Sequence, residues 1–171
     1  MIFHRHDLVF SDWKQIDTST IQNEEFKKLI LQNILPGIVR REEIDVTQGD
    51  NYYSEKETVF IGFVYPYTEN GRRLRFGSSV SGNKITKLVT PYEITNFKFQ
   101  SRTPALSALY HVKNEFKVGV WGSTSLEIIT GLPYTHDKSD LDLIVKNCAP
   151  DELIGLLSLC NEIESKMRIK I

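Results

Sequence analysis

The stretch that most restricts the possible fold is residues 118–146, where two short strand patterns flank a small apolar helix. The second strand pattern, residues 139–145, alternates polar with apolar residues, and side chains on a strand alternate between its two faces. Asp140 and Asp142 are therefore expected on one face, with the leucines that follow each of them on the other. The pattern predicts two carboxylates side by side on a strand whose opposite face is apolar.

Two neighbouring carboxylates repel each other and raise each other's pKa unless a positive charge lies between them. Carboxylate oxygens suit Mg²⁺, which commonly binds one or two carboxylates together with water and the phosphates of a substrate. Asp140 and Asp142 are thus candidate metal ligands and candidate catalytic residues. The alternative is that both form the solvated face of an edge strand, since a D-x-D pattern alone is common.

A Gly-Ser pair upstream of the aspartates favours the metal interpretation. Residues 118–121 predict a strand, Gly122 and Ser123 a turn, and residues 125–130 a short apolar helix. Backbone N–H groups at the start of a helix bind phosphate. Gly122 and Ser123 are therefore candidate phosphate-binding residues.

The order of strand, Gly-Ser, helix and S-D-L-D-L resembles the nucleotidyltransferase superfamily of the DNA polymerase beta type. The sequence between the motifs narrows this resemblance, because T-G-L-P-Y at residues 130–134 precedes S-D-L-D-L at residues 139–143. Together these motifs resemble the malonate decarboxylase holo-[acyl-carrier-protein] synthases, a family also called phosphoribosyl-dephospho-CoA transferases. Shorter matches lie in the first half of the chain, with H-D-L at residues 6–8, I-V-R-R at residues 38–41 and G-R-R-L-R-F at residues 71–76.

The resemblance implies an α+β fold in two domains. A small N-terminal α/β-hairpin domain, residues 1–100, would bind substrate or carrier. A polymerase-beta-like nucleotidyltransferase domain with a mixed sheet, residues 101–171, would carry out catalysis. The expected helix at Thr103-Pro104 follows the predicted boundary, because proline is favoured at the first position of a helix.

The resemblance also implies a reaction. It is the Mg²⁺-dependent transfer of a phosphoribosyl-dephospho-CoA group from its triphosphate to a serine of the malonate decarboxylase acyl carrier protein, with release of diphosphate. In this family pattern Asp140 and Asp142 would bind two Mg²⁺ ions, Gly122 and Ser123 would bind the triphosphate, and Ser139 would position the start of the strand beside the substrate.

Arginines of a predicted hairpin form a further candidate site. Residues 58–65 and 72–80 read as two strands joined by a tight turn at Asn70-Gly71, and Arg73 and Arg75 share one face of the second strand. Arginine binds phosphate in a bidentate manner, although the charges could simply keep an exposed hairpin soluble. The resemblance makes Arg73, Arg75 and Arg41 candidate ligands for the triphosphate, the dephospho-CoA phosphates or an acidic carrier protein.

Polymerase-beta-type transferases use a third carboxylate on a neighbouring strand. Residues 167–171 alternate like the start of such a strand, but no Asp or Glu follows Glu164. We therefore expect either a truncated member of the family or a contribution from Glu162 or Glu164 in the helix predicted over residues 151–165. Two other functions stay open, a binding module without turnover and a nucleotidyltransferase that acts on a different substrate.

Composition restricts the function classes. The 171 residues include 21 basic and 22 acidic ones, so the chain has no strong overall field, which argues against binding to a nucleic-acid polymer. Two cysteines, Cys148 and Cys160, are too few for a disulfide framework or a zinc site. No apolar run has the length of a membrane span or the form of a signal peptide, so we expect a cytoplasmic protein that does not bind membranes.

A helix is also predicted near the N-terminus. Residues 20–35 place apolar side chains at three- and four-residue spacing, and Ser19 or Thr20 is the expected cap. This helix is expected to contribute to the core rather than to a site.

Overall fold

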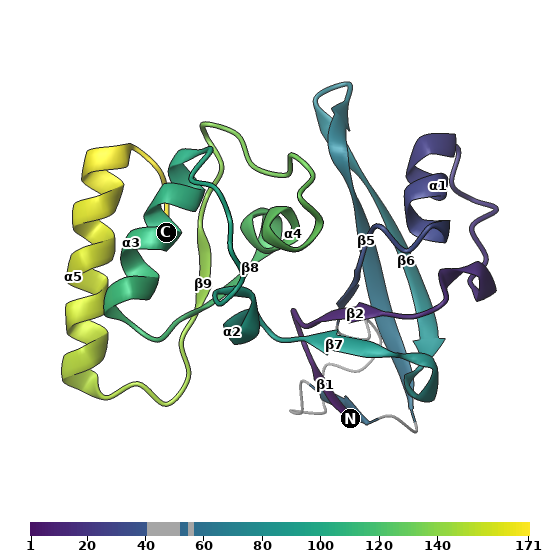
Figure 1. The fold of residues 1–171 in the computed structure, drawn as a ribbon, viewed down its shortest axis with the longest axis horizontal. Coiled ribbons are helices and arrows are strands. Elements are labelled where there is room, and N and C mark those ends of the chain that lie inside the picture. The colour runs from purple at the N-terminus through teal and green to yellow at the C-terminus, as the bar shows by residue number, and fades with distance from the viewer. Residues whose placement is uncertain (41–51, 55–56) are drawn as a thin grey trace. The chain divides into compact units, whose positions relative to one another are not determined.

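The computed structural model describes residues 1–40, 52–54 and 57–171. Two compact units follow one another along the chain, Met1–Val89 and Thr90–Ile171 (Figure 1). Helices and sheets are both present, which confirms the α+β class. The units divide between Val89 and Thr90, whereas the sequence placed the domain boundary between residues 100 and 101.

The first unit is built on a five-stranded antiparallel sheet in the order β6-β5-β3-β2-β7. Its strands are β2 (Leu8–Phe10), β3 (Gly37–Val39), β5 (Thr58–Glu69), β6 (Arg72–Ser81) and β7 (Lys87–Val89). A separate pair joins β1 (Ile2–His4) to β4 (Tyr52–Ser54). The helical elements are η1 (Trp13–Gln15), α1 (Glu24–Leu31) and η2 (Gly82–Lys84).

The β5–β6 hairpin confirms the prediction of two strands and a tight turn. Asn70 and Gly71 both have positive φ angles, 49° and 77°, as the turn requires. The paired residues Phe63 and Phe76 stack with their ring centroids 6.2 Å apart. Trp13 packs edge-on against Phe63, and its indole N–H donates to a backbone carbonyl 3.1 Å away. Aromatic packing of this kind forms the core of the first unit.

Helix α1 is shorter than predicted and has a different cap. It begins at Glu24, and the Asn23 side chain accepts the Phe26 N–H at 2.7 Å. The expected caps, Ser19 and Thr20, precede the helix, because asparagine meets the N–H groups of the first turn equally well. Phe26 is buried, so α1 contributes to the core as expected.

The second unit combines four helices with one pair of strands. In chain order these are α2 (Pro91–Ile94), α3 (Pro104–Glu115), β8 (Gly119–Trp121), α4 (Gly122–Thr130), β9 (Asp142–Ile144) and α5 (Pro150–Met167). Helix α3 packs beside α5 (Figure 1). The strands β8 and β9 are antiparallel, so within residues 90–171, all of which the structure describes, the expected mixed sheet is replaced by a two-stranded ladder.

The strand predicted over residues 167–171 is wrong. Helix α5 continues through Met167 and ends where Arg168 adopts a left-handed conformation, φ 55°. An ion pair between Glu162 and Lys166, four residues apart on the helix, favours this continuation. The Leu141 N–H donates to the Lys170 carbonyl at 2.8 Å, so the end of the chain lies beside the segment that enters β9.

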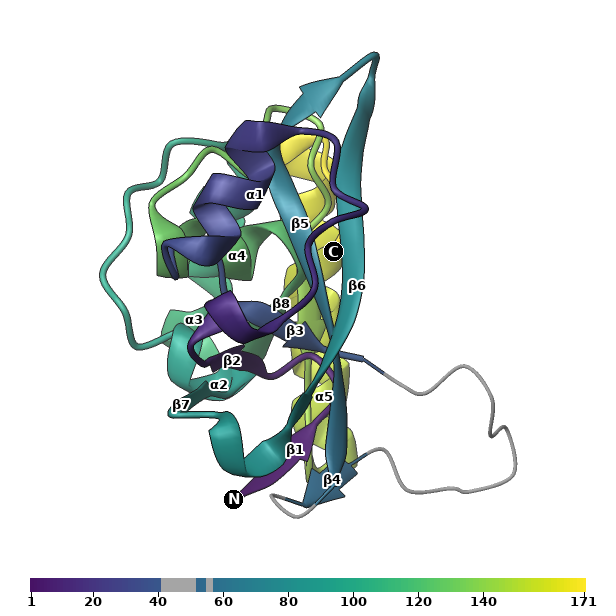
Figure 2. The ribbon, with the colours of Figure 1, turned by 90° about the vertical axis from the view of Figure 1, so that its right-hand side faces the viewer.

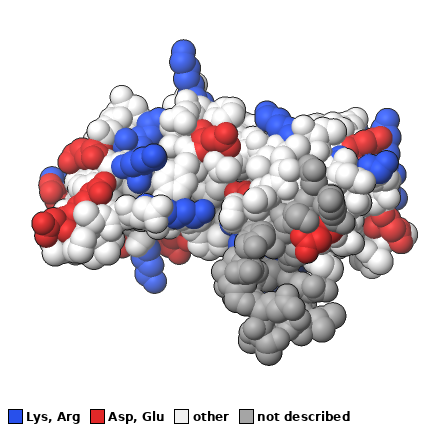
Figure 3. Space-filling view, turned by 90° about the horizontal axis from the view of Figure 1, so that it is seen from below, with Lys and Arg blue, Asp and Glu red and all other residues white. Residues whose placement is uncertain are grey.

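Basic and acidic side chains are mixed on the face seen in Figure 3, in keeping with the near-neutral charge of the chain. In the part of the chain that the structure describes, no helix is both long enough and apolar enough to cross a bilayer.

Candidate metal and phosphate site

The candidate site is centred on the junction between β8 and α4. Strand β8 ends at Trp121 and the helix begins at the next residue, Gly122, whose φ is +69°. A Cβ atom at position 122 would lie 3.2 Å from Cγ of Asp142 and closer still to its Oδ2. Glycine is therefore needed here for two reasons, the left-handed backbone and the space that the Asp142 carboxylate occupies.

Strand pairing brings Asp142 to the junction of β8 and α4 at Gly122 and Ser123, which we call the Gly-Ser bend. Trp121 is the register partner of Asp142 in the β8–β9 ladder. Leu141 is buried and Asp140 is exposed, but Asp142 and Leu143 are both half-buried, so the predicted alternation does not extend to Leu143. The two sequence motifs, far apart in the chain, thus meet at one point.

The predicted strand over residues 139–145 is too long, since β9 covers only Asp142–Ile144. A turn precedes it, in which the Ser139 N–H donates to the His136 carbonyl at 3.0 Å and the His136 N–H donates to the Ser139 hydroxyl at 2.9 Å. Asp140 therefore lies just before the strand. Ser139 is buried in this turn, where its hydroxyl fixes the local backbone.

The electrostatics of the two carboxylates fit a cation. Burial raises the pKa of Asp142 above its ordinary value of 3.8, and the negative charge of Asp140 raises that pKa further. Holding both groups ionised is therefore unfavourable without a counter-charge. A divalent cation with a preference for oxygen ligands, such as Mg²⁺, matches this pair of donors.

The start of α4 offers donors to an anion next to these carboxylates. Trp121 occupies the position before the helix and provides no side-chain cap for its first N–H groups. The Thr124 hydroxyl is buried and has no hydrogen-bond partner among the described residues. The Ser125 hydroxyl, in contrast, donates to the Gly122 carbonyl at 2.8 Å.

An ion pair between the exposed Arg102 and the buried Glu127, which sequence reasoning missed, anchors the loop between α4 and β9. Glu127 accepts two hydrogen bonds from the Arg102 guanidinium, both at 2.9 Å, and one from the Thr135 N–H at 2.6 Å. Arg102 also donates to the Thr135 carbonyl at 2.7 Å, and the hydroxyls of Thr103 and Thr135 lie 2.8 Å apart. The only sequence signal for this cluster is a lone charged residue in the apolar run of α4.

The proposed substitutes for a third carboxylate have other partners. Glu162 pairs with Lys166, and the Glu164 carboxylate accepts the Ile171 N–H at 2.7 Å. Over the described ranges, no group of three or more His, Cys, Asp or Glu side chains is arranged to hold a metal ion. The aspartate pair is therefore without a third acidic ligand in this part of the chain.

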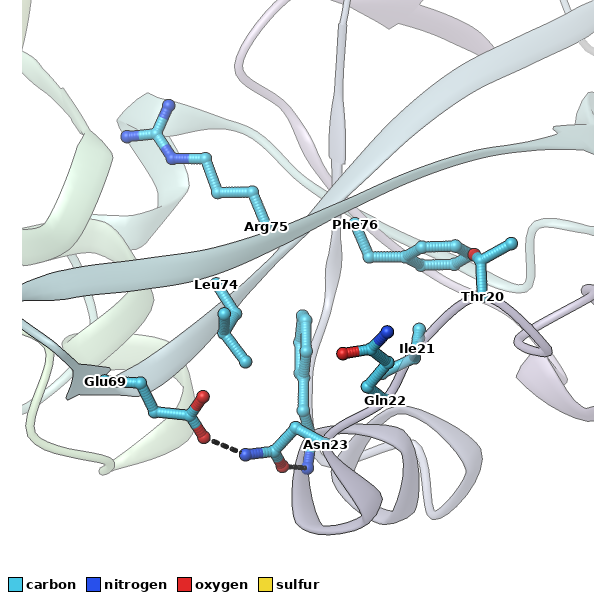
Figure 4. A pocket seen from close by; sticks show the side chains of 9 residues that line it. Thr20, Ile21, Gln22, Asn23, Glu69, Leu74, Arg75 and Phe76 are labelled. Carbon is cyan, nitrogen blue, oxygen red and sulfur yellow. Dashed lines mark hydrogen bonds between the residues drawn. The ribbon is translucent and has the colours of Figure 1, made fainter.

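The candidate arginines belong to the first unit, whereas the aspartates belong to the second. Arg73 and Arg75 lie on β6, paired with Thr68 and Val64 of β5. Arg75 extends away from a groove into which Leu74 points (Figure 4). Arg41 lies outside the described residues.

Comparison with known proteins finds one matching family model, which covers most of the second unit, and two similar proteins. Residues 93–171 match the family model described as the phosphoribosyl-dephospho-CoA transferase MdcG C-terminal domain. A phosphoribosyl-dephospho-CoA transferase from Pseudomonas fluorescens is 30% identical over 80 residues, which make up 44% of this chain and 38% of that protein. A protein of the same name from Xanthomonas axonopodis pv. citri is 27% identical over 135 residues, or 77% of this chain and 60% of that protein.

These matches confirm the family resemblance read from the motifs. The chain spans less than two thirds of the length of either of these curated relatives. No solved structure matches it.

Proposed function

We propose, from the likeness of this chain to the phosphoribosyl-dephospho-CoA transferases, that it acts in the transfer of a phosphoribosyl-dephospho-CoA group. In the proposed reaction the group moves from its triphosphate to a serine hydroxyl of the malonate decarboxylase acyl carrier protein. The matched residues, 93–171, include both the Gly-Ser bend and the two aspartates. The family name supports phosphoribosyl-dephospho-CoA as the transferred group. The chemistry of the site supports a reaction of the nucleotidyl-transfer type.

One observation carries the proposal. The Asp142 carboxylate lies against Gly122, so the proposed metal ligand adjoins the first N–H groups of α4. A polyphosphate chelated by a divalent cation needs both features at once, oxygen ligands for the cation and N–H donors for the phosphate oxygens. A solvated edge strand would require neither the glycine nor the contact.

Asp140 and Asp142 would hold Mg²⁺, which supplies neutralisation of the polyphosphate charge when it is bound. The N–H groups of Gly122 and Ser123 would orient the β- and γ-phosphates, and the Ser123 hydroxyl would donate one further hydrogen bond. The serine oxygen of the carrier then forms a bond to the α-phosphorus, the bond to diphosphate breaks, and the hydroxyl proton is released. Among the described residues, no third acidic side chain is grouped with the two aspartates, so we assign no general base for that proton.

The arginines of the first unit would bind the anionic partners of the reaction. Arg75 is exposed on β6, and Arg73 lies two residues earlier on the same strand. We infer that they, with Arg41, bind phosphates of the substrate or acidic side chains of the carrier protein.

A second candidate function is binding without turnover. The absence of a third acidic ligand among the described residues favours it, because Asp140 and Asp142 suffice to hold a Mg²⁺-polyphosphate but leave the attacking hydroxyl without base assistance.

A two-part experiment separates these functions. Thermal unfolding of the full chain is measured with triphosphoribosyl-dephospho-CoA in the presence of Mg²⁺ or of EDTA, and the acyl carrier protein is then assayed by mass spectrometry for the added group. A ligand at about a hundredfold excess over its Kd stabilises the folded state by about 2.7 kcal/mol. Stabilisation with modification supports transfer, and stabilisation alone supports a binding module. If neither occurs, both proposals fail.

A further inference from the structure

A groove in the first unit lies outside the proposed metal site. It has a volume of about 500 Å³ and lies between β6 and the segment that leads into α1. Its apolar lining comes from Ile21, Phe26, Leu74 and Phe76, and its polar lining includes Thr20, Gln22, Asn23, Glu69 and Arg75. Leu74 and Phe76 point into the groove from β6. Arg75 belongs to the lining, but its guanidinium extends on the opposite side of the strand from Leu74 (Figure 4).

The helical side of the groove is held in place by contacts to the sheet. The Phe26 ring packs against Tyr65 with centroids 5.4 Å apart, and the Tyr65 hydroxyl donates to the Glu25 carboxylate at 2.7 Å. Asn23 donates a hydrogen bond to Glu69 across one end. Because its walls are fixed in this way, a ligand that enters the groove loses little free energy to ordering them.

The other side of the groove is an edge strand. β6 is ten residues long and ends the strand order of its sheet, so in the described part of the chain it pairs only with β5 (Figure 2). It contains no proline, and the irregularity of the β5–β6 ladder falls between Val64 and Thr68 of β5. An edge of this kind presents backbone N–H and C=O groups that a further strand can pair with.

Side chains on β6 specify what such a strand would carry. Leu74 and Phe76 face the groove, and Arg75 faces the opposite side of the strand (Figure 4). Arg73 shares the side of Arg75 by the two-residue period. Neighbouring strands place side chains of the same face about 5 Å apart, so apolar residues would meet Leu74 and Phe76 while acidic residues would meet the exposed Arg75.

We propose that β6 and the groove beside it bind an extended segment of a protein partner in which acidic and apolar residues alternate. The segment pairs with β6 as an additional strand, its backbone supplies affinity, and its alternating side chains supply specificity. This inference shares Arg73 and Arg75 with the proposed function but uses none of the residues of the proposed metal site, so it can be tested separately from the transfer reaction.

The test uses the full chain and a fluorescein-labelled peptide, Glu-Val-Glu-Leu-Glu-Val-Glu-Leu, with binding followed by fluorescence anisotropy. One control peptide has the same composition with all acids at one end, and another carries Lys in place of Glu. The alternating acidic peptide is expected to bind about tenfold or more tightly than either control. Equal binding of the acidic peptides would mean ionic adhesion to the arginines and would overturn the proposal, as would absence of binding.

A charge reversal tests the assigned face. Arg75→Glu changes an exposed side chain. It is expected to weaken binding of the acidic peptide about tenfold or more and to strengthen binding of the Lys peptide. The matched control Lys14→Glu makes the same change on an exposed residue outside the groove and should leave binding unchanged. Equal loss in both variants would refute the assigned face.

Hydrogen exchange then reports strand addition directly. Bound peptide should slow exchange of backbone amides in β6 but not in β7, which forms the other edge of the same sheet. Binding without added protection of β6 contradicts pairing.

Discussion

Substituting alanine at Gly122 tests whether the bend and the carboxylate form one site. The left-handed backbone, φ +69°, costs an L-residue about 1–2 kcal/mol. The new Cβ atom would also lie 3.2 Å from Cγ of Asp142 and closer to its Oδ2, so the carboxylate must rotate from its present position. Driving that side chain off its rotamer costs about 0.5–1.5 kcal/mol more. We expect the free energy of unfolding to fall by about 1.5–3.5 kcal/mol.

Gly131→Ala is the matched control. Gly131 ends α4 with nearly the same φ angle, +71°, but a Cβ there has no neighbour within 4 Å. This variant should lose only the backbone term of about 1–2 kcal/mol. The difference between the variants isolates the displaced carboxylate, and urea unfolding measures both.

Ligand binding decides the functional part of this prediction. Stabilisation by Mg²⁺ with the triphosphate, followed by thermal unfolding, should be lost in Gly122→Ala and kept in Gly131→Ala. Equal stabilisation of the two variants would refute the reasoning, because the carboxylate would then have no role in binding the metal.

Three further predictions concern other groups of the second unit. Because the pKa of Asp142 is raised in the folded state, ionising this side chain destabilises the protein as the pH rises from 3.8 through the folded-state pKa. Urea unfolding without metal should therefore show Asp142→Asn to be more stable than the parent at pH 7 and no more stable below pH 3.8. Tyr92→Phe removes a buried hydroxyl without a partner among the described residues and should raise the free energy of unfolding by about 1 kcal/mol, whereas Tyr110→Phe, on an exposed ring, should leave it unchanged. Glu127→Gln should lower the free energy of unfolding by about 1.5–3 kcal/mol and speed hydrogen exchange in the loop before β9. Glu162→Gln, which loses an exposed ion pair, should change it much less. An unchanged midpoint for Tyr92→Phe, or equal losses for the two glutamate variants, would contradict these assignments.

Local patterns in the sequence predicted several turns and helix starts correctly. The hairpin turn at Asn70-Gly71 and the start of α3 at Pro104 depend on backbone preferences of single residues, which act over a few positions. The meeting of Gly122 with Asp142 could be anticipated from the order of the motifs, although only the β8–β9 register fixes it.

Features that depend on distant contacts could not be predicted in this way. Arg102, Glu127 and Thr135 come from three separate segments, and their spacing in the sequence carries no periodic signal. The strand expected over residues 167–171 fails for a related reason, since a short alternating pattern does not show whether a partner strand is present, and here α5 runs through Met167 and residues 168–171 are irregular. The groove beside β6 likewise results from the packing of α1 on the sheet.

The position of the bound metal tests the central claim most directly. Mn²⁺ replaces Mg²⁺ and broadens the NMR signals of nearby amides, so it is added with inorganic triphosphate to the isotope-labelled full chain. We predict that the amides of Gly122, Ser123 and Asp142 broaden first and that Asp142→Asn abolishes the effect. Broadening centred on other residues, or unchanged by that substitution, would contradict a metal site formed by the aspartates and the Gly-Ser bend.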